Sequence, residues 1–425
     1  MSAEPHTTFS GGDASTGNGT TPRAGFREFV VSMAFLISLI AMGIDAMLPA
    51  LGLISEDLSI MGENHAQFVV AILFAGMAFG QILFGPLSES TGRKYAVYIG
   101  LAVFVTGSLI AMVTPNFTVL LIARFMQGFG GAAGQIIAMA MVRDRYNGRD
   151  MARVLSLVMG VFILVPAVAP TIGQSILFIG DWRAIFFFLA LQGLACLALL
   201  HFRIEETLPV ERRKPYRVSM VLSGLKAVVT TPVTIGYTIC AGCIFGGIIA
   251  YVSSAHQIFQ EMYDTGTLFP LFFGMIALSI GVASFTNSTL VRKFGMRRLV
   301  ATGISGIFTL TGLFLMWQLF VDATPPLALF VVFAMSTFFC FGMLFGNLNA
   351  MAMEPMGHIA GIAAAAMSCI STTMSVTIGT LIGQSFNGTV LPLTAGLFGL
   401  SILAACVMFT TEKLRGPEPV PQPGE

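Results

Sequence analysis

Long apolar runs, separated by short polar breaks, follow one another along almost the entire chain. Each run holds about 20 residues, enough for a helix that rises about 1.5 Å per residue to cross the ~30 Å hydrocarbon core of a bilayer. The pattern predicts twelve membrane-spanning helices, at residues 29–53, 66–87, 95–113, 117–142, 152–178, 182–202, 228–255, 267–290, 298–319, 326–350, 359–382 and 388–410. The expected fold is therefore an all-α membrane protein.

A polar segment at 203–227 divides these spans six and six. The two sets share a short match, since IGQS occurs at 172–175 in the fifth span and at 382–385 in the eleventh. Two related halves with a site near their interface are typical of secondary transporters. We expect two pseudo-symmetric six-helix halves, 25–202 and 228–410, joined by a cytoplasmic loop, with a disordered N-terminal tail at 1–24 and a C-terminal tail at 411–425.

Composition excludes a water-soluble globular protein, because 55% of the residues are hydrophobic, only 10% are charged and the mean hydropathy is +0.84. The net charge of +1 gives no indication of nucleic-acid binding. All six cysteines fall inside predicted spans, where neither a disulfide framework nor a zinc site is expected. We therefore expect no cofactor and no metal.

The basic residues indicate the orientation, because cytoplasmic loops accumulate Lys and Arg. With the N-terminus in the cytoplasm, all but two of the 22 Lys and Arg residues fall on the cytoplasmic side. The exceptions are Arg183, in an outer loop, and Arg124, inside a span. Both termini are therefore expected to be cytoplasmic.

Two charged residues lie inside predicted spans, Asp45 in the first and Arg124 in the fourth. A charge at the centre of a membrane helix costs ~2.5–3.5 kcal/mol on insertion scales, so such residues usually face an interior cavity and are functional. Counting from the span ends places both roughly 10–14 Å below the outer surface. We expect Asp45 to carry a proton and Arg124 to tune it. The alternative is a buried ion pair that only holds the helices together.

The sequence near these two charges predicts local structure. Pro49 cannot donate the helical hydrogen bond to the carbonyl of residue 45, so the first span should bend or open at the carboxylate. In the fourth span, polar and small residues recur at helical spacing and predict a narrow cavity wall, made up of Arg124, Gln127, Gly128, Gly131 and Gln135. The GxxxG of Gly130 and Gly134 favours close helix packing on the adjoining face.

The segment GPLSESTGRK, at 85–94, follows the second span. Gly92 permits a tight turn with φ > 0, Glu89 can face a helix N-terminus, and Arg93 can pair with an acid such as Asp144. These properties suit a cytoplasmic gate. The alternative is that the basic residues only set the topology.

The same segment resembles the signature of the loop between helices 2 and 3 in the major facilitator superfamily, with Glu89 in place of the usual Asp; the matching residues are Gly85, Leu87, Glu89, Gly92, Arg93 and Lys94. RFMQGFG at 124–130 resembles the family's helix 4 motif, and GVFILVPAVAPTIG at 160–173 its helix 5 antiporter motif. IDAMLPAL and NAMAMEPMGHIAG resemble the bicyclomycin/chloramphenicol-resistance (Bcr/CflA) subfamily.

The resemblance implies a twelve-helix drug:proton antiporter of the bacterial inner membrane, driven by the proton motive force. It implies that helix 5 lies at the interface between the halves and limits leak, through the motif residues Gly160, Pro166, Pro170 and Gly173. Aromatic residues of spans seven and ten would suit a pliable substrate pocket, although lipid-facing helices are also rich in Phe. The predicted substrate cavity comprises Met42, Gln127, Gly131, Gln135, Tyr237, Tyr251, Phe338 and Phe341.

We therefore expect a monomeric, proton-coupled multidrug exporter of small apolar or amphipathic compounds that works by alternating access. A proton-coupled metabolite exporter or importer of the same fold is the alternative. The sequence has no HExxH, no GxSxG, no paired intramembrane carboxylates and no Walker motif, so an enzyme is not expected. Two Gly-rich halves with a gate also disfavour a channel. Glu354, at the end of the tenth span, is the next candidate should Asp45 not be the coupling site.

Overall fold

The computed structural model describes residues 24–62, 64–321 and 324–415. Within these ranges twelve spans are long and apolar enough to cross a membrane, which confirms the predicted number. The first span consists of α1 (Phe26–Asp45), a 3₁₀ turn η1 (Leu48–Ala50) and α2 (Leu51–Asp57). The other eleven are α3 (Phe68–Thr91), α4 (Arg93–Val113), α5 (Phe117–Arg145), α6 (Gly148–Leu177), α7 (Trp182–Arg203), α9 (Pro232–His256), α10 (Phe269–Phe294), α11 (Met296–Phe320), α12 (Leu327–Met353), α13 (Ala360–Gln384) and α14 (Leu391–Arg415).

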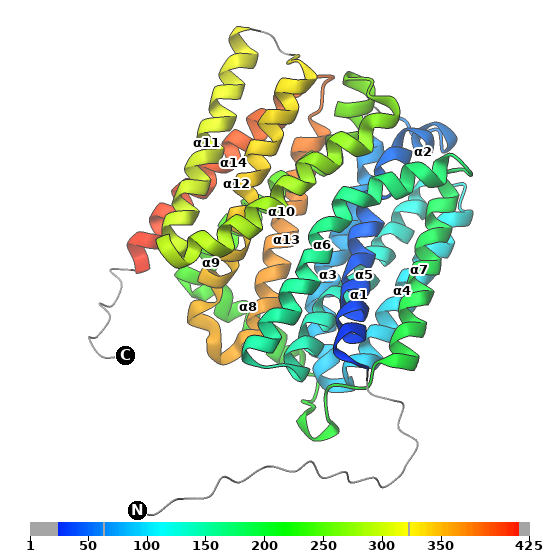
Figure 1. The fold of residues 1–425 in the computed structure, drawn as a ribbon, viewed down its shortest axis with the longest axis vertical. Helices are drawn as coiled ribbons and strands as arrows, with labels where there is room; N and C mark the ends of the chain where they lie inside the picture. The colour runs from blue at the N-terminus through cyan, green and yellow to red at the C-terminus, as the bar shows by residue number, and fades with distance from the viewer. Residues whose placement is uncertain (1–23, 63, 322–323, 416–425) are drawn as a thin grey trace, which may run out of the picture.

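The helices lie side by side in one elongated bundle (Figure 1). We refer to α1–α7 as the N-terminal half and to α9–α14 as the C-terminal half. Helix α8 (Val218–Thr230) lies at the lower end in Figure 1 and α2 at the upper end, so we call these the α8 end and the α2 end. The chain enters α1 at the α8 end.

Two predicted boundaries were wrong. The segment between the halves is not only a loop, because it contains α8, and the seventh span begins at Pro232 and not at 228. Residues 411–415 belong to α14 and not to a tail. Hydropathy marks only the apolar part of a helix, whereas backbone hydrogen bonds continue the helix past it. The predicted tail residues 1–23 and 416–425 lie outside the described residues.

Small residues let the helices of the N-terminal half approach closely. A Cβ on Gly130 would collide with backbone atoms of α4, and one on Gly134 would stand 3.0 Å from the carbonyl oxygen of Leu36 in α1. The close packing expected from the GxxxG is therefore present.

The two halves meet along two helix pairs. Helix α3 packs along α13, and α6 packs along α10. Midway along the first pair, Thr372 of α13 donates a hydrogen bond of 3.2 Å to Gln81 of α3. Contacts between the halves therefore run through the interior of the bundle as well as at its ends.

Candidate functional site

The first span is interrupted at a buried carboxylate, that of Asp45. Helix α1 ends at Asp45, and Ala46 and Met47 lead into the 3₁₀ turn that contains Pro49. Because Pro49 has no N–H, the carbonyl of Asp45 cannot receive the usual helical hydrogen bond. The interruption predicted at this carboxylate is present.

Asp45 is buried, with 4% of its surface exposed. Among the described residues, no hydrogen bond or ion pair to its carboxylate occurs, although the Tyr251 hydroxyl of α9 lies within electrostatic range. A buried carboxylate without a partner is costly when ionised. Such a group is therefore a candidate for reversible protonation.

Arg124 is fully buried in α5 and donates three hydrogen bonds. Its Nε donates to the carbonyl of Val69 at 2.9 Å, its Nη2 to the carbonyl of Gly43 at 2.9 Å, and its Nη1 to the side chain of Gln127 at 2.7 Å. These bonds join α5 to α3 and α1. In the described part of the chain no ion pair links Arg124 to Asp45, and the hydrogen bonds of Arg124 go to neutral groups.

The polar face of α5 lies largely inside the N-terminal half. Gln127 is fully buried and donates a 2.7 Å hydrogen bond to Ser108 of α4. Ile40 of α1 covers Gly131, where an added Cβ would stand 2.7 Å from its Cδ1. Gln135 is half-buried, and its Oε1 has no hydrogen-bond partner among the described residues. Of the predicted cavity wall, only the Gln135 amide is left with an unused acceptor.

Aromatic rings of the C-terminal half gather around Tyr251. Its ring stacks on Phe273 of α10 at 5.6 Å and meets Phe338 of α12 edge-on at 4.7 Å, and Phe338 in turn contacts Phe341 at 5.2 Å. We call these four residues the aromatic cluster. Phe273 was not predicted, because nothing in its sequence context distinguishes it from the many lipid-facing phenylalanines. Met42, predicted to line the same cavity, is buried three residues before Asp45.

Tyr237 does not belong to this cluster. It precedes Tyr251 by fourteen residues, or ~21 Å along α9, and its hydroxyl donates to Glu412 of α14 near the α8 end. The sequence could not separate the two tyrosines, because both fall in the same apolar span.

At the α2 end, four amide side chains join the halves. Asn64 donates to the backbone carbonyls of Gln384 and Phe386, each at 2.9 Å, and Gln384 donates to the carbonyl of Asn64 at 2.8 Å. Gln67 donates to Gln257, which follows α9, and to the carbonyl of Gly383 at 3.0 Å. We call Asn64, Gln67, Gln257 and Gln384 the amide cluster. Sequence analysis missed it, although Gln384 lies in the repeated IGQS.

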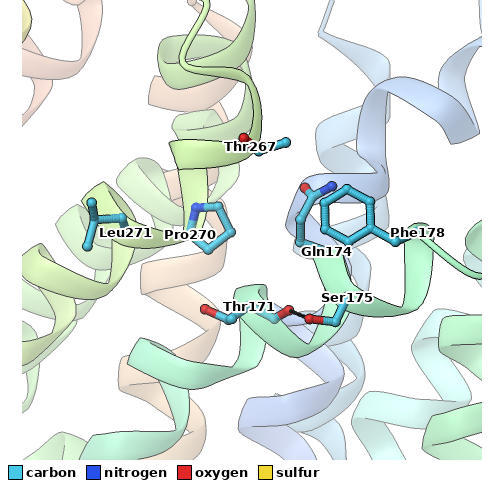
Figure 2. A pocket seen from close by; sticks show the side chains of 7 residues that line it. All are labelled: Thr171, Gln174, Ser175, Phe178, Thr267, Pro270 and Leu271. Carbon is cyan, nitrogen blue, oxygen red and sulfur yellow. Dashed lines mark hydrogen bonds between the residues drawn. The ribbon is translucent and has the colours of Figure 1, made fainter.

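The other IGQS, in α6, faces a cleft and not an amide cluster. This cleft of about 360 Å³ lies between the end of α6 and the start of α10. In Figure 2, Gln174 and Phe178 line one side, and Thr267 and Pro270 line the other. The α6–α10 side of the α2 end is thus more open than the α3–α13 side.

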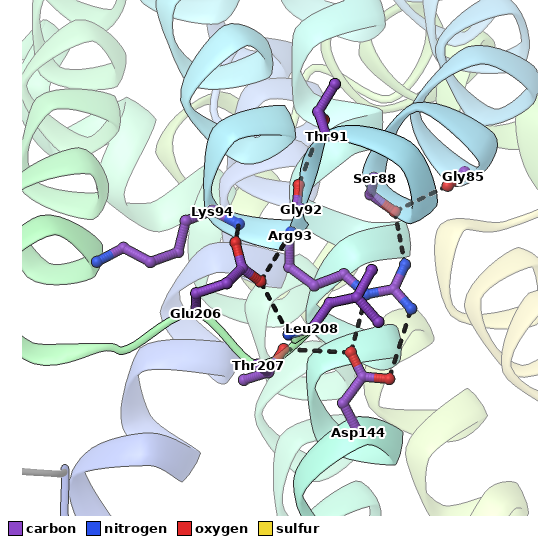
Figure 3. A network of polar contacts seen from close by, with 10 residues as sticks. All are labelled: Gly85, Ser88, Thr91, Gly92, Arg93, Lys94, Asp144, Glu206, Thr207 and Leu208. Atoms are coloured by element: carbon purple, nitrogen blue, oxygen red, sulfur yellow. Dashed lines mark hydrogen bonds and ion pairs between the residues drawn. The ribbon is translucent and has the colours of Figure 1, made fainter. Parts of the chain in front are cut away.

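At the α8 end, the segment 85–94 takes part in a network of charged side chains (Figure 3). Arg93 forms the expected ion pair with Asp144 at 2.8 Å and also donates to Ser88 at 2.7 Å. Glu206, from the segment between the halves, accepts from the backbone N–H groups of Arg93 and Lys94 at 2.9 and 3.0 Å. We call Arg93, Asp144 and Glu206 the ionic cluster.

Glu89 lies at a different helix N-terminus from Glu206. A Cβ on Gly361, in the first turn of α13, would stand 3.2 Å from Oε1 of Glu89. Its backbone carbonyl accepts from the N–H of Lys214 at 3.0 Å. A Cβ on Gly85 would stand 3.6 Å from the Cβ of Ala365 in α13, and the carbonyl of Leu87 accepts from Ser90 at 2.9 Å. The segment therefore touches the C-terminal half directly.

Helix α6 keeps both Pro166 and Pro170 inside one continuous helix. It packs closely on α10, where a Cβ on Gly274 would stand 2.9 Å from the carbonyl oxygen of Ala167. Gly173 lies against the backbone of Ala46, directly after Asp45, whereas the space beside Gly160 is open. No group of three or more metal-binding side chains occurs among the described residues.

A bundle of twelve membrane-spanning helices with its polar groups at the interface of two halves is the architecture of a secondary transporter. Residues 33–383 match the sequence model of the Major Facilitator Superfamily, and the chain belongs to this family. It is therefore a transporter and not an enzyme, and a multi-pass protein of the inner membrane.

Several characterised and uncharacterised relatives share this family. The chain is 30% identical to a bicyclomycin resistance protein homolog of Haemophilus influenzae, with 90% of this chain and 94% of the relative covered. It is 29% identical to the uncharacterised MFS-type transporter YdgK of Bacillus subtilis, with 91% and 96% covered. Identity to the multidrug resistance protein MdtL of Escherichia coli is 27%, with 80% and 84% covered.

Solved structures show the same fold. The human organic anion transporter MFSD10 superposes with a TM-score of 0.66 at 14% identity, covering 91% of this chain and 99% of that one. The xylose transporter XylE from E. coli gives a TM-score of 0.65 at 15% identity, covering 90% and 97%. The predicted fold and family are both confirmed.

Proposed function

We propose that this transporter exports small apolar or amphipathic drug-like compounds in exchange for protons, with Asp45 as the proton carrier. The relatives named for bicyclomycin resistance and multidrug resistance support this substrate class and direction. One observation carries the proton coupling: the buried Asp45 carboxylate, at the break in α1, has no hydrogen-bond or ion-pair partner among the described residues.

The cycle follows from the two forms of this carboxylate. When the site opens to the acidic exterior, a proton binds Asp45 and the compound leaves. When it opens to the cytoplasm, the proton leaves and a compound binds again. A ligand shifts a conformational equilibrium only through different affinities for its states, so exchange requires that the two protonation forms favour different conformations.

Arg124 would support this cycle by positioning. Its hydrogen bond to the carbonyl of Gly43 holds the last turn of α1 two residues before Asp45. Its charge also adds a positive potential within the N-terminal half, although its hydrogen bonds go to neutral groups. We therefore assign Arg124 to positioning and tuning of the carboxylate.

The other motifs fit transport by alternating access, in which the two halves open toward one side of the membrane at a time. The α8 end, with the basic segment 85–94 and the ionic cluster, would be the cytoplasmic gate, with both termini in the cytoplasm. In α6, the close contact with α10 would limit leak between the halves, and Gly173 packs on Ala46 within the N-terminal half. Each protein would act as a monomer on small molecules and protons.

Substrate-induced proton release from purified protein tests the proposal. In lightly buffered detergent solution, addition of a compound to which the protein confers resistance should release protons from the parent and none from Asp45→Asn. The matched control is Glu56→Gln, which removes an exposed carboxylate of α2 and should behave as the parent.

Equal proton release by Asp45→Asn and the parent would place the coupling group elsewhere. Uptake into inside-out and right-side-out vesicles under an imposed pH gradient then distinguishes an exporter from an importer. Net uptake into right-side-out vesicles, driven by inward proton flow, would contradict export.

A further inference from the structure

Two buried polar groups, one from each half, lie within electrostatic range of each other, and neither has a hydrogen-bond partner in the part of the chain that the structure describes. Asp45 comes from α1 of the N-terminal half, and Tyr251 from α9 of the C-terminal half. Tyr251 is 2% exposed, and its hydroxyl is unpaired within the described residues. A buried polar group that is left unpaired is costly, because it has lost its hydrogen bonds to water. The pair is thus a favourable position for a ligand that satisfies both groups at once.

Contacts on either side hold the two groups in place. His256, five residues after Tyr251 on α9, forms a 3.0 Å hydrogen bond with the carbonyl of Leu48, three residues after Asp45. The Tyr251 ring is fixed by its stack on Phe273 and its edge contact with Phe338. The hydroxyl therefore cannot turn to another partner without breaking the aromatic cluster.

The chemistry of the two groups restricts the ligand. An ionised carboxylate only accepts hydrogen bonds, whereas a phenol hydroxyl needs an acceptor for its proton. A hydroxyl or amide of the ligand can donate to Asp45 and accept from Tyr251. An organic cation without an acceptor satisfies Asp45 but leaves the phenol proton unpaired.

We propose that an uncharged substrate bridges Asp45 and Tyr251 through a hydroxyl or amide group, with its apolar body against the aromatic cluster. This inference rests on the proposed function and names the substrate class of the same site. Protonation of Asp45 removes its negative charge, which turns a strong acceptor for the substrate's donor into a weaker one. The bridge also spans the two halves, so the bound substrate contacts both bodies that move.

Binding to purified protein tests the bridge with two probes. Chloramphenicol is uncharged and carries hydroxyls and an amide; tetraphenylphosphonium is a cation with no hydrogen-bonding group. Tyr251→Phe removes only the hydroxyl and should weaken chloramphenicol binding about tenfold, the value of one hydrogen bond, while leaving tetraphenylphosphonium binding unchanged. In an Asp45→Leu background the same change should cost less, because the bridge has already lost one end.

The control is Tyr263→Phe, which removes a hydroxyl that donates to the carbonyl of Pro325 at 2.7 Å, outside the site. It should bind both probes as the parent does. Unchanged chloramphenicol binding by Tyr251→Phe, an equal loss for both probes, or a parent that binds only the cation would overturn the bridge while the proposed export stands. A parent that binds neither probe and confers no resistance would contradict the proposed function itself.

Discussion

The guanidinium of Arg124 donates its hydrogen bonds to neutral acceptors on α1, α3 and α5, and not to an acid. Its Cζ also lies 5.9 Å from the centroid of the Phe186 ring, so Arg124 contacts α7 as well. One side chain therefore organises most of the N-terminal half. A residue with so many structural partners affects stability as well as transport.

Arg124→Ala should lower the free energy of unfolding by on the order of 2–5 kcal/mol, because it removes three buried hydrogen bonds, to Gln127 and to two backbone carbonyls. The measurement is a thermal melt in detergent with a thiol-reactive dye, since Cys196, Cys240 and Cys243 are buried until the protein unfolds. The control, Arg292→Ala, alters an exposed arginine of α10 and should melt as the parent does. Equal melting of both variants would show that the three bonds contribute little.

Single residues were predicted unevenly. Asp45 and Arg124 were identifiable because a charge inside an apolar span is conspicuous. The Arg93–Asp144 pair was identifiable because the two residues carry opposite charges and each lies at the end of a span. Their partners were not identifiable. Arg124 bonds backbone carbonyls, which every residue carries, and Tyr251 is set apart from Tyr237 only by its depth along α9.

Among the elements, the turn between α3 and α4 is closely constrained by its surroundings. Gly92 has φ of 101°, a conformation that side chains rarely adopt, and a Cβ there would stand 2.7 Å from Oε2 of Glu206 and 2.8 Å from Nη2 of Arg213. The corresponding turn before α11 contains Gly295, with φ of 78° and open space around it. A side chain at either position would therefore be strained by the backbone conformation, but only at Gly92 would it also collide with neighbouring side chains.

Gly92→Val should abolish transport with normal insertion in the membrane, because it displaces Glu206 from the start of α4. Gly295→Val carries similar strain and should retain most of the transport activity. Transport is measured in vesicles with expression matched by immunoblot. Equal loss in both variants would assign the effect to strain alone, and wild-type activity of Gly92→Val would exclude a role for this turn in the gate.

The boundary of an element was predictable where the apolar run ends at the same residue as the helix. It was not predictable where the helix continues past the apolar run. Helix α8 was missed because its 13 largely apolar residues are too few to span a membrane, and the charged residues before it mark the segment as a connection. The break in α1 was found because proline acts locally and needs no knowledge of the rest of the fold.

At the scale of the whole molecule, the halves touch at both ends. The amide cluster joins them at the α2 end, and Glu89 reaches α13 at the α8 end. Asn64 and Gln384 are 320 residues apart, and neutral amides leave no charge pattern, so the sequence gives no sign of their contact. Twelve spans and two halves were therefore predictable, but the contacts between the halves were not.

Replacing both Gln67 and Gln384 by Ala should favour opening at the α2 end, because the hydrogen bonds of these two side chains hold α3 to α13 there. Spin labels at Met61 and Asn387, both exposed, in a background without native cysteines report the distance between the halves. The double variant should shift the distribution to longer distances. Gln260→Ala, which removes a bond within the C-terminal half at the same end, should not. An unchanged distribution in the double variant would mean that other contacts hold this end closed.

Because one end of the molecule is held by neutral amides and the other by charged groups, the two ends should respond differently to the salt concentration. The Debye length falls from about 8 Å at 0.15 M to about 3 Å at 1 M, so salt weakens exposed ionic contacts but hardly affects bonds between neutral amides. Concentrated electrolyte should therefore loosen the exposed Glu206 from the start of α4, affect the largely buried Arg93–Asp144 pair much less, and leave the amide cluster as it is. If the α8 end faces the cytoplasm, the ionic strength of that compartment alone biases the resting conformation, and water loss from the cell would favour the state that is ready to take up its substrate.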